Sequence, residues 1–346
     1  MMRPVDNPPN PWAKGHVEWL DEPPAATLTI YEERARSVLS ENKSPDISFR
    51  FSLNPYRGCL HACAYCYARP SHQYLGFGAG TDFDRKIVVK VNAPEVLRKE
   101  LERPSWEGDR IVMSGNTDCY QGLEGSYELT RRCLDVCLDF QNPVGIITKG
   151  QLVARDADLL GQLAKRARAS VMFSIPFARD EDAAKLEPYA AKPSRRFAAM
   201  KRIADAGVRV GLMIAPVIPG INDSDIPELL ERAKEAGASR AAYTPLRLPA
   251  EVLPVFDARL EEAYPDRADK VRGLVRELRG GRMNDPNFGS RFEGQGQRWA
   301  TIVQLFEVHM KRLGLDGRSR DALGEVEPTT FRRPEIQGSL FDLRRR

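Results

Sequence analysis

Residues 51–67 read FSLNPYRGCLHACAYCY, which is a short apolar strand followed by a loop with three cysteines. Cys59, Cys63 and Cys66 have the spacing C-x3-C-x2-C. Three thiols this close together, in a chain that begins without an apolar signal sequence, indicate a metal site and argue against a disulfide framework. On one loop they can hold a [4Fe–4S] cluster in which one iron has no protein ligand.

A structural zinc ion is the main alternative for this loop. Such zinc sites take four protein ligands, usually completed by a second pair of cysteines or histidines. No such pair stands nearby, although His61 and His72 could each supply one ligand. The spacing therefore favours the iron–sulfur cluster, and zinc or plain buried thiols are the other interpretations.

Short apolar runs recur after this first strand and alternate with stretches of helical periodicity. The runs lie at residues 110–114, 144–148, 170–175, 208–214 and 241–243. Continuous apolar runs are typical of buried parallel strands, so the alternation predicts an α/β fold with a partial or full barrel of about six βα units. Functional residues of such folds collect in loops at the C-terminal ends of the strands, which is where the cysteines lie.

The rest of the 346-residue chain divides by composition. We predict a proline-rich extended arm over residues 1–50, a barrel core over 51–250, a helical extension over 251–313 and a flexible tail over 314–346. No stretch approaches the roughly 18 apolar residues of a membrane span, so we expect a cytoplasmic protein without membrane contact. The net charge of +4 excludes a broadly basic chain, and any nucleic-acid site must be local.

Three further stretches follow predicted strands: SGNTD at residues 114–118, Ser174, and IPGIND at residues 218–223. Together with the cysteine loop they resemble the motifs of the radical S-adenosylmethionine (SAM) superfamily. The resemblance covers about residues 50 to 250. It implies a partial (β/α)6 TIM-like barrel, with the proline-rich arm and the helical C-terminal extension outside it.

The resemblance also implies cofactors and site residues. The three cysteines would hold a [4Fe–4S] cluster whose open iron is chelated by SAM, and an electron donor such as flavodoxin or ferredoxin would reduce it. Residues expected to contact SAM are Tyr65 on the adenine side, Gly115, Asn116, Thr117 and Asp118 at the ammonium group, Ser174 at the ribose, and Ile218 and Gly220 at the adenine. Lys149 and the pair Arg195 and Arg196 are candidate partners of the SAM carboxylate.

Within the superfamily, the chain looks most like the branch related to spore photoproduct lyase, which repairs DNA. In that branch a cysteine three residues before the aspartate of the second-strand motif donates a hydrogen atom. Gly115 occupies that position here, which puts thymine-dimer reversal in doubt. Cys119 is the candidate for a displaced donor, with a buried bystander thiol as the alternative, whereas Cys133 and Cys137 share the apolar face of a predicted helix and belong to the core.

Other features indicate nucleic acid. Gln337, Leu340 and Phe341 resemble the peptide by which repair proteins dock on the DNA sliding clamp. An arginine stripe (Arg272, Arg276 and Arg279) and the arginine- and glycine-rich segment 291–299 could track phosphates and stack bases, although a solvated helix face and an ordinary helix entry would look the same.

The sequence therefore predicts a radical SAM enzyme that acts on a nucleic acid, on a DNA lesion or a modified base. A radical SAM enzyme for a peptide or small metabolite is the alternative. A non-catalytic iron–sulfur or zinc protein that senses redox state is a third interpretation.

Overall fold

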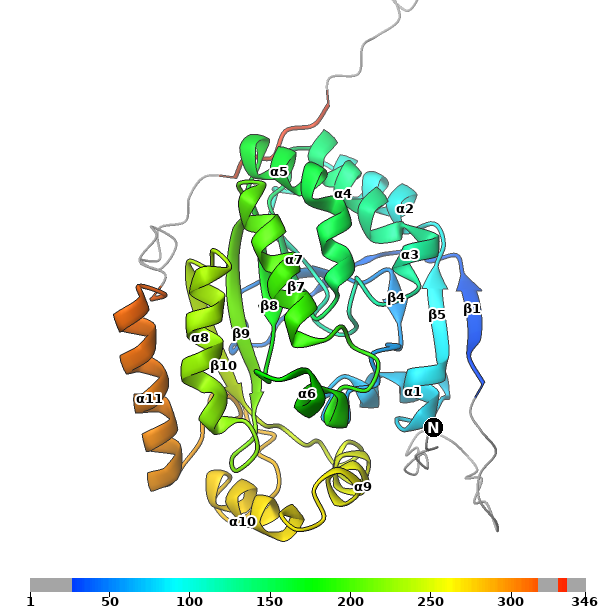
Figure 1. The fold of residues 1–346 in the computed structure, drawn as a ribbon. Helices are drawn as coiled ribbons and strands as arrows, with labels where there is room; N and C mark the ends of the chain where they lie inside the picture. Colours follow the sequence, from blue (N-terminus) through cyan, green and yellow to red (C-terminus); the bar gives the residue numbers. More distant parts are fainter. Residues whose placement is uncertain (1–26, 317–328, 335–346) are drawn as a thin grey trace, which may run out of the picture.

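The computed structural model describes residues 27–316 and 329–334 of the chain. A seven-stranded sheet with the order β10-β9-β8-β7-β6-β3-β2 forms its centre (Figure 1). Six of these strands are parallel and follow the chain order: β3 (Phe51–Leu53), β6 (Ile111–Met113), β7 (Val144–Thr148), β8 (Ala169–Ser174), β9 (Arg209–Val217) and β10 (Arg240–Pro245). They coincide with the six predicted strands, so the predicted βα repeat is confirmed.

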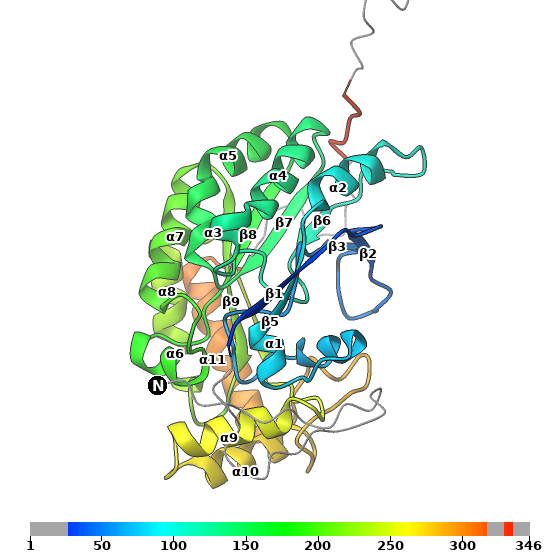
Figure 2. The same ribbon diagram turned by 90° about the vertical axis from the view of Figure 1, so that its right-hand side faces the viewer.

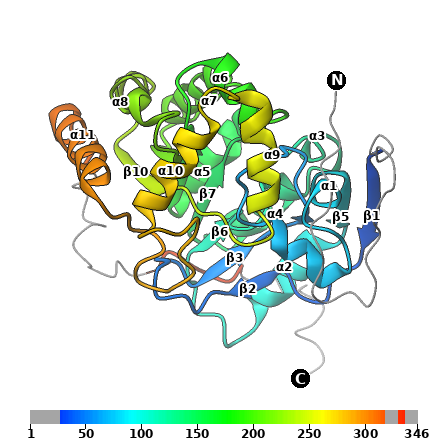
Figure 3. The ribbon, with the colours of Figure 1, turned by 90° about the horizontal axis from the view of Figure 1, so that it is seen from below.

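The sheet curves but does not close within the described ranges. Its last strand on one side is β10, and on the other side β2 (Leu39–Glu41) pairs antiparallel with β3. Seen from below, the strands lie along an arc (Figure 3). This is the partial barrel that the sequence predicted.

Helices cover the outer face of this sheet, as Figure 2 shows. They are α2 (Ala93–Glu102), α4 (Leu129–Asp139), α5 (Ala157–Arg166), α7 (Pro193–Asp205), α8 (Ile226–Glu235) and α11 (Gln297–Leu313). Each turns an apolar stripe towards the strands, and together they form the main core. Cys133 and Cys137 of α4 are fully buried in this core, as expected.

A second sheet, with the order β1-β5-β4, was not predicted. It consists of β1 (Thr29–Glu33), β5 (Lys86–Lys90) and β4 (Tyr56–Arg57), and α1 (Thr81–Arg85) precedes β5 directly. Because β1 and β2 both lie before residue 50, the described part of the predicted arm is extended and pairs with both sheets.

The remaining elements are short or lie beyond the strand ends. They are η1 (Arg69–Leu75), α3 (Glu124–Tyr127), η2 (Gln151–Asp156), α6 (Asp180–Leu186), η3 (Asp223–Asp225), α9 (Leu253–Ala263) and α10 (Ala268–Leu278). In Figure 1, α9 and α10 lie below the arrowheads of β9 and β10, at the C-terminal ends of the strands. This end of the barrel is called the mouth below.

Residues 329–334 pack at the opposite end. The Thr329 hydroxyl donates to the Gly108 carbonyl over 2.7 Å, and Phe331 stacks on Phe140 with ring centroids 6.0 Å apart. Both partners lie in segments that lead into strands. The peptide Gln337–Phe341 that resembles a clamp-binding motif lies outside the described residues. None of the helices in the described ranges is long and apolar enough to cross a bilayer.

Candidate functional site

The three cysteines lie between β4 and η1, on the loop that follows the first parallel strand. Cys59 and Cys63 are buried, Cys66 is half-buried, and all three are free thiols. The loop begins at Gly58, whose φ of +78° suits glycine. A Cβ there would lie 2.9 Å from both the Phe83 carbonyl oxygen and Ile87, so the backbone in front of Cys59 leaves no room for a side chain.

The buried guanidinium of Arg69 fixes the middle of this loop. Its Nε and Nη2 donate to the Cys63 carbonyl over 3.2 and 3.0 Å. It also donates to the carbonyl of Gly80 over 2.9 Å and pairs with Asp84 at 3.1 Å. One side chain therefore joins the second cysteine to the segment that enters α1.

The thiols form a donor set that fits an iron–sulfur cluster. Burial raises the pKa of all three, and the other cysteines raise the pKa of Cys59 and Cys63 further, so the three groups interact. Thiolates crowded in this way need cationic partners, which a cluster of iron ions supplies. In the described part of the chain no three cysteine, histidine or carboxylate side chains stand close enough together to hold one metal ion.

The segment after β6 lies against the cysteine loop. The Gly115 carbonyl accepts a hydrogen bond from the Tyr67 hydroxyl at 2.6 Å, and the Thr117 hydroxyl donates to the Tyr56 carbonyl at 2.8 Å. Asn116 is exposed and its amide donates to Ser71. Three of the predicted SAM-contacting residues thus line the border between the strand end and the loop.

Asp118 connects three parts of the mouth. Its carboxylate accepts hydrogen bonds from the Thr148 hydroxyl at 2.7 Å, from the Lys149 backbone N–H at 2.6 Å and from the Tyr120 backbone N–H at 2.9 Å. It also lies 3.5 Å from Nδ1 of His61 in the cysteine loop. These partners give Asp118 a clear role in joining β6, β7 and the loop.

Lys149 and Ser174, at the ends of β7 and β8, lie in contact with each other. The Lys149 ammonium donates to the Ser174 hydroxyl at 2.5 Å and lies 3.4 Å from the carboxylate of Glu187. It also lies 5.7 Å from the centre of the Tyr65 ring. Three residues predicted from separate motifs are therefore in one cluster.

Two further members of this cluster, Glu187 and Arg196, differ from what the sequence predicted. Glu187 was not predicted, and of the pair Arg195 and Arg196 only Arg196 turns inward, whereas Arg195 is exposed on α7. Glu187 and Arg196 form an ion pair that is fully buried, and the Tyr65 hydroxyl donates to the same carboxylate. Arg196 lies four residues before Met200 on the buried face of α7, and this spacing could have indicated its direction.

The loop after β9 packs on the other side of Tyr65. Ile218 is fully buried in the same apolar cluster as Tyr65, and its N–H donates to the buried Asn222 side chain at 2.6 Å. Gly220 has a φ of +84°, and a Cβ there would lie 2.9 Å from Leu274 of α10. Close packing by α10 therefore explains the glycine in this motif.

Cys119 does not lie on the surface of the mouth. It is fully buried in the main core with Cys133 and Cys137, and its N–H donates to the Ser114 hydroxyl at 3.2 Å. Burial raises the pKa of its thiol well above the ordinary range. Hydrogen donation by Cys119 stays a prediction, and its surroundings are those of a core thiol.

The predicted arginine stripe on α10 does not form an open cationic face. Arg272 is paired with Asp257 at 2.6 Å, Glu261 at 2.5 Å and Asp269 at 2.8 Å. Arg279 is buried and donates to backbone carbonyls, including that of Leu246 at 2.6 Å. Tertiary partners therefore use the donors of Arg272 and Arg279, whereas Arg276 is exposed, and a phosphate track on this helix stays a prediction.

The arginine- and aromatic-containing segment near residue 291 instead reaches the cysteine loop. An alternating series of rings and guanidinium groups runs through Tyr67, Arg247, Phe292, Arg291 and Phe288. The successive distances from guanidinium carbon to ring centre are 5.8, 4.8, 5.2 and 4.4 Å. We call these five residues the aromatic–arginine row; it starts directly after Cys66.

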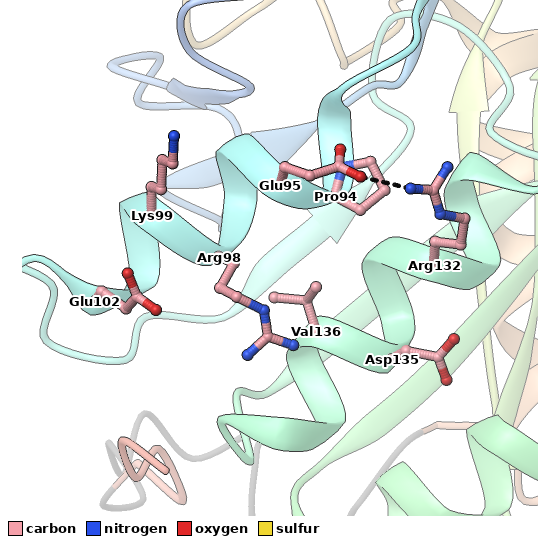
Figure 4. A pocket seen from close by; sticks show the side chains of 8 residues that line it. All are labelled: Pro94, Glu95, Arg98, Lys99, Glu102, Arg132, Asp135 and Val136. Carbon is pink, nitrogen blue, oxygen red and sulfur yellow. Dashed lines mark hydrogen bonds and ion pairs between the residues drawn. The ribbon is translucent and has the colours of Figure 1, made fainter. Parts of the chain in front are cut away.

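A shallow hollow between α2 and α4 lies away from these residues (Figure 4). Both of its arginines are paired: Arg132 with Glu95 at 2.6 Å, and Arg98 with Asp139. It contains none of the predicted site residues, so the mouth of the barrel is the candidate site.

Comparisons with known proteins agree with this location. The model of the radical SAM superfamily matches residues 53–233. An uncharacterized protein of Mycobacterium tuberculosis is 37% identical over 267 residues, which cover 76% of this chain and 78% of that protein. A radical SAM Nalpha-GlyT isomerase of Pseudomonas phage M6 is 24% identical over 281 residues, or 80% of this chain and 56% of that protein.

Solved structures share the fold. Spore photoproduct lyase complexed with dinucleoside spore photoproduct aligns with a TM-score of 0.60 and 17% identity, covering 82% of this chain and 79% of that one. A mutant of the lyase with bound AdoMet and the same dinucleoside has a TM-score of 0.55 at 17% identity and covers 83% of this chain and 79% of that one.

Proposed function

Because this chain belongs to the radical SAM superfamily, and is therefore an enzyme that uses a [4Fe–4S] cluster and SAM, we propose that its substrate is a nucleic acid. The target within it is a lesion or a modified base. When bound, the cluster and SAM together supply a 5′-deoxyadenosyl radical by reductive cleavage of the sulfonium C–S bond. The chain's own residues bind, orient and enclose these groups.

The roles follow from the positions described above. Cys59, Cys63 and Cys66 hold the cluster. Lys149 lies 5.7 Å from the Tyr65 ring centre and is hydrogen-bonded to Ser174, and these two polar groups would bind polar parts of SAM. Asn116 is exposed beside the cysteine loop and has an amide with which to bind the SAM ammonium or carboxylate.

An apolar layer covers Cys63 and Tyr65 of the cysteine loop. Cys63 and Tyr65 belong to a cluster of buried side chains that includes Ile218 and the α9 and α10 residues Phe256 and Val271. A radical must be kept from water and from stray hydrogen donors, and apolar walls provide this protection. The helices after residue 250 therefore complete the enclosure and are not a separate appendage.

The structural observation that supports a nucleic-acid substrate is the aromatic–arginine row beside the cluster loop. Two of its rings are unusually open: Tyr67 is 52% exposed and Phe288 is 62% exposed. Exposed rings interleaved with guanidinium groups suit a strand of nucleic acid, since the rings can stack on bases while the cations attract phosphates.

Relatives support the same substrate class. The spore photoproduct lyase structure that shares this fold was solved with a dinucleoside lesion, and its similarity extends well beyond the superfamily core. Docking of the C-terminal Gln337, Leu340 and Phe341 on a sliding clamp, and reduction by a flavodoxin or ferredoxin, belong to the same proposal.

The test is SAM cleavage by the anaerobically reconstituted protein under reducing conditions. We expect 5′-deoxyadenosine to form, and single- or double-stranded DNA or RNA to bind at low salt and to accelerate or redirect its formation. Cys59→Ala is the control and should form none, which excludes a purely redox-sensing role. Absence of affinity for all these polymers, or stimulation by peptides alone, would overturn the proposal.

A further inference from the structure

Arg247 is held at the mouth by its neighbours in the chain. It stands two residues after β10 ends at Pro245, and Leu246 and Leu248 on either side are buried. The Leu246 carbonyl accepts two hydrogen bonds from Arg279, at 3.2 and 2.6 Å, and the Leu248 N–H donates to Asn284 at 3.2 Å. The backbone therefore fixes where the Arg247 side chain starts.

Two aromatic rings contact the guanidinium of Arg247. Its central carbon lies 4.8 Å from the Phe292 ring centre and 5.8 Å from that of Tyr67. Its Nε is buried and has no hydrogen-bond partner among the described residues. A buried donor without a partner is costly, so this guanidinium is suited to an acceptor that the described residues do not supply.

The charges around Arg247 favour an anionic acceptor. Arg291 and Arg279 are the cations that face it, and Asp46 and Asp285 are the acidic groups. Arg291 already pairs with Asp46 at 2.5 Å. Arg279 donates hydrogen bonds to the backbone carbonyls of Leu246, Arg291 and Glu293. Burial, and then the charge of Arg291, lower the pKa of Arg247. An anion here would relieve the excess of positive charge.

Resting on the proposed function, we propose that Arg247 binds a backbone phosphate of the nucleic-acid substrate, next to a base that stacks on Tyr67. A guanidinium presents paired donors that match two phosphate oxygens. Because the rings and the cations alternate along the row, the rings can stack on the bases of one strand while the cations bind its phosphates. The place of Tyr67 directly after Cys66 sets that base beside the reaction centre.

The experiment measures the binding of a ten-nucleotide oligothymidylate to the reconstituted full-length protein over a series of salt concentrations. We expect Arg247→Ala to weaken binding and to reduce the slope of log affinity against log salt by about 0.7, the value for one lost contact with a single strand. Arg247→Gln, which removes the charge but keeps a polar side chain, should do the same. Arg166→Ala is the matched control, since Arg166 is an exposed arginine at the end of α5, away from the mouth.

Each outcome decides a separate point. If the wild-type protein binds but both Arg247 variants keep its salt slope, Arg247 is not a phosphate ligand, and the proposed function is unaffected. If the wild-type protein binds no nucleic acid, both proposals fail. If a polyglutamate peptide of equal charge binds as tightly and with the same dependence on Arg247, the site is a general anion site and the assignment to a nucleic-acid phosphate is overturned.

Discussion

The carboxylate of Glu187 pairs with the guanidinium of Arg196, and neither side chain is exposed. The Tyr65 hydroxyl donates to the same carboxylate, and Arg196 also donates to the Ser174 carbonyl at 2.8 Å. Although burial by itself raises the pKa of Glu187, the charges of Arg196 and Lys149 bring that pKa below its ordinary value. The pair thus holds the hydroxyl of Tyr65, the residue directly before the third cysteine.

Arg196→Met should destabilise the protein by about 3–5 kcal/mol, because it leaves the Glu187 charge buried without its partner. Urea unfolding measures this loss. The neighbouring Arg195→Met is the control, since Arg195 is exposed and its replacement should change the free energy of unfolding by less than about 0.5 kcal/mol. Equal effects of the two substitutions would contradict the buried-pair interpretation.

Gly58→Ala should reduce iron incorporation, because the new Cβ would meet the Phe83 carbonyl at 2.9 Å and shift the backbone in front of Cys59. Gly76→Ala separates this effect from backbone strain. Gly76 has a similar φ of +76°, but nothing lies within 4 Å of a Cβ there. Both substitutions should cost about 1–2 kcal/mol through the positive φ, and only Gly58→Ala should also lower the iron and sulfide content per chain.

Cys66→Ala should abolish both the visible absorption of the iron–sulfur cluster and the formation of 5′-deoxyadenosine, since a ligand is lost. Cys119→Ala should keep both, because Cys119 is buried in the main core with Cys133 and Cys137 and is not one of the three spaced cysteines. Its cost should appear only as lower stability, of about 1–2 kcal/mol for a small cavity. Loss of iron from the Cys119 variant would show that this thiol takes part in the cluster site.

The contribution of the Arg69–Asp84 pair to the free energy of unfolding should depend on pH. Burial raises the pKa of Asp84 to about 6, although the charge of Arg69 acts in the opposite direction. The native state therefore binds a proton more tightly than the unfolded state, whose Asp pKa is about 3.9, so this group adds stability as the pH falls from 6.5 to 4. The wild type should gain about 2 kcal/mol relative to Asp84→Asn over this range. A difference that stays constant with pH would exclude the raised pKa.

The pattern of the chain was enough to predict the barrel. Runs such as Val144–Thr148 and Ser170–Ile175 are apolar because both faces of a parallel strand are buried, and periodicity reports that burial directly. The second sheet could not be found in this way. Its strand β4 has two residues, and β1 pairs with β5 more than fifty residues away, so no local pattern marks them.

The sequence by itself determined the three cysteines, the superfamily and the strand ends that carry Asp118, Lys149 and Ser174, because these depend on residue type and spacing along the chain. Only the tertiary structure decided which arginines serve the site. Arg195 and Arg196 are adjacent in sequence and differ only in which face of α7 they occupy, and Arg272 and Arg279 are used by partners that their helical spacing does not reveal. The same holds for Arg247. Its charge is not paired with a carboxylate of the described residues because of the residues that surround it in space, and these come from four separate parts of the chain.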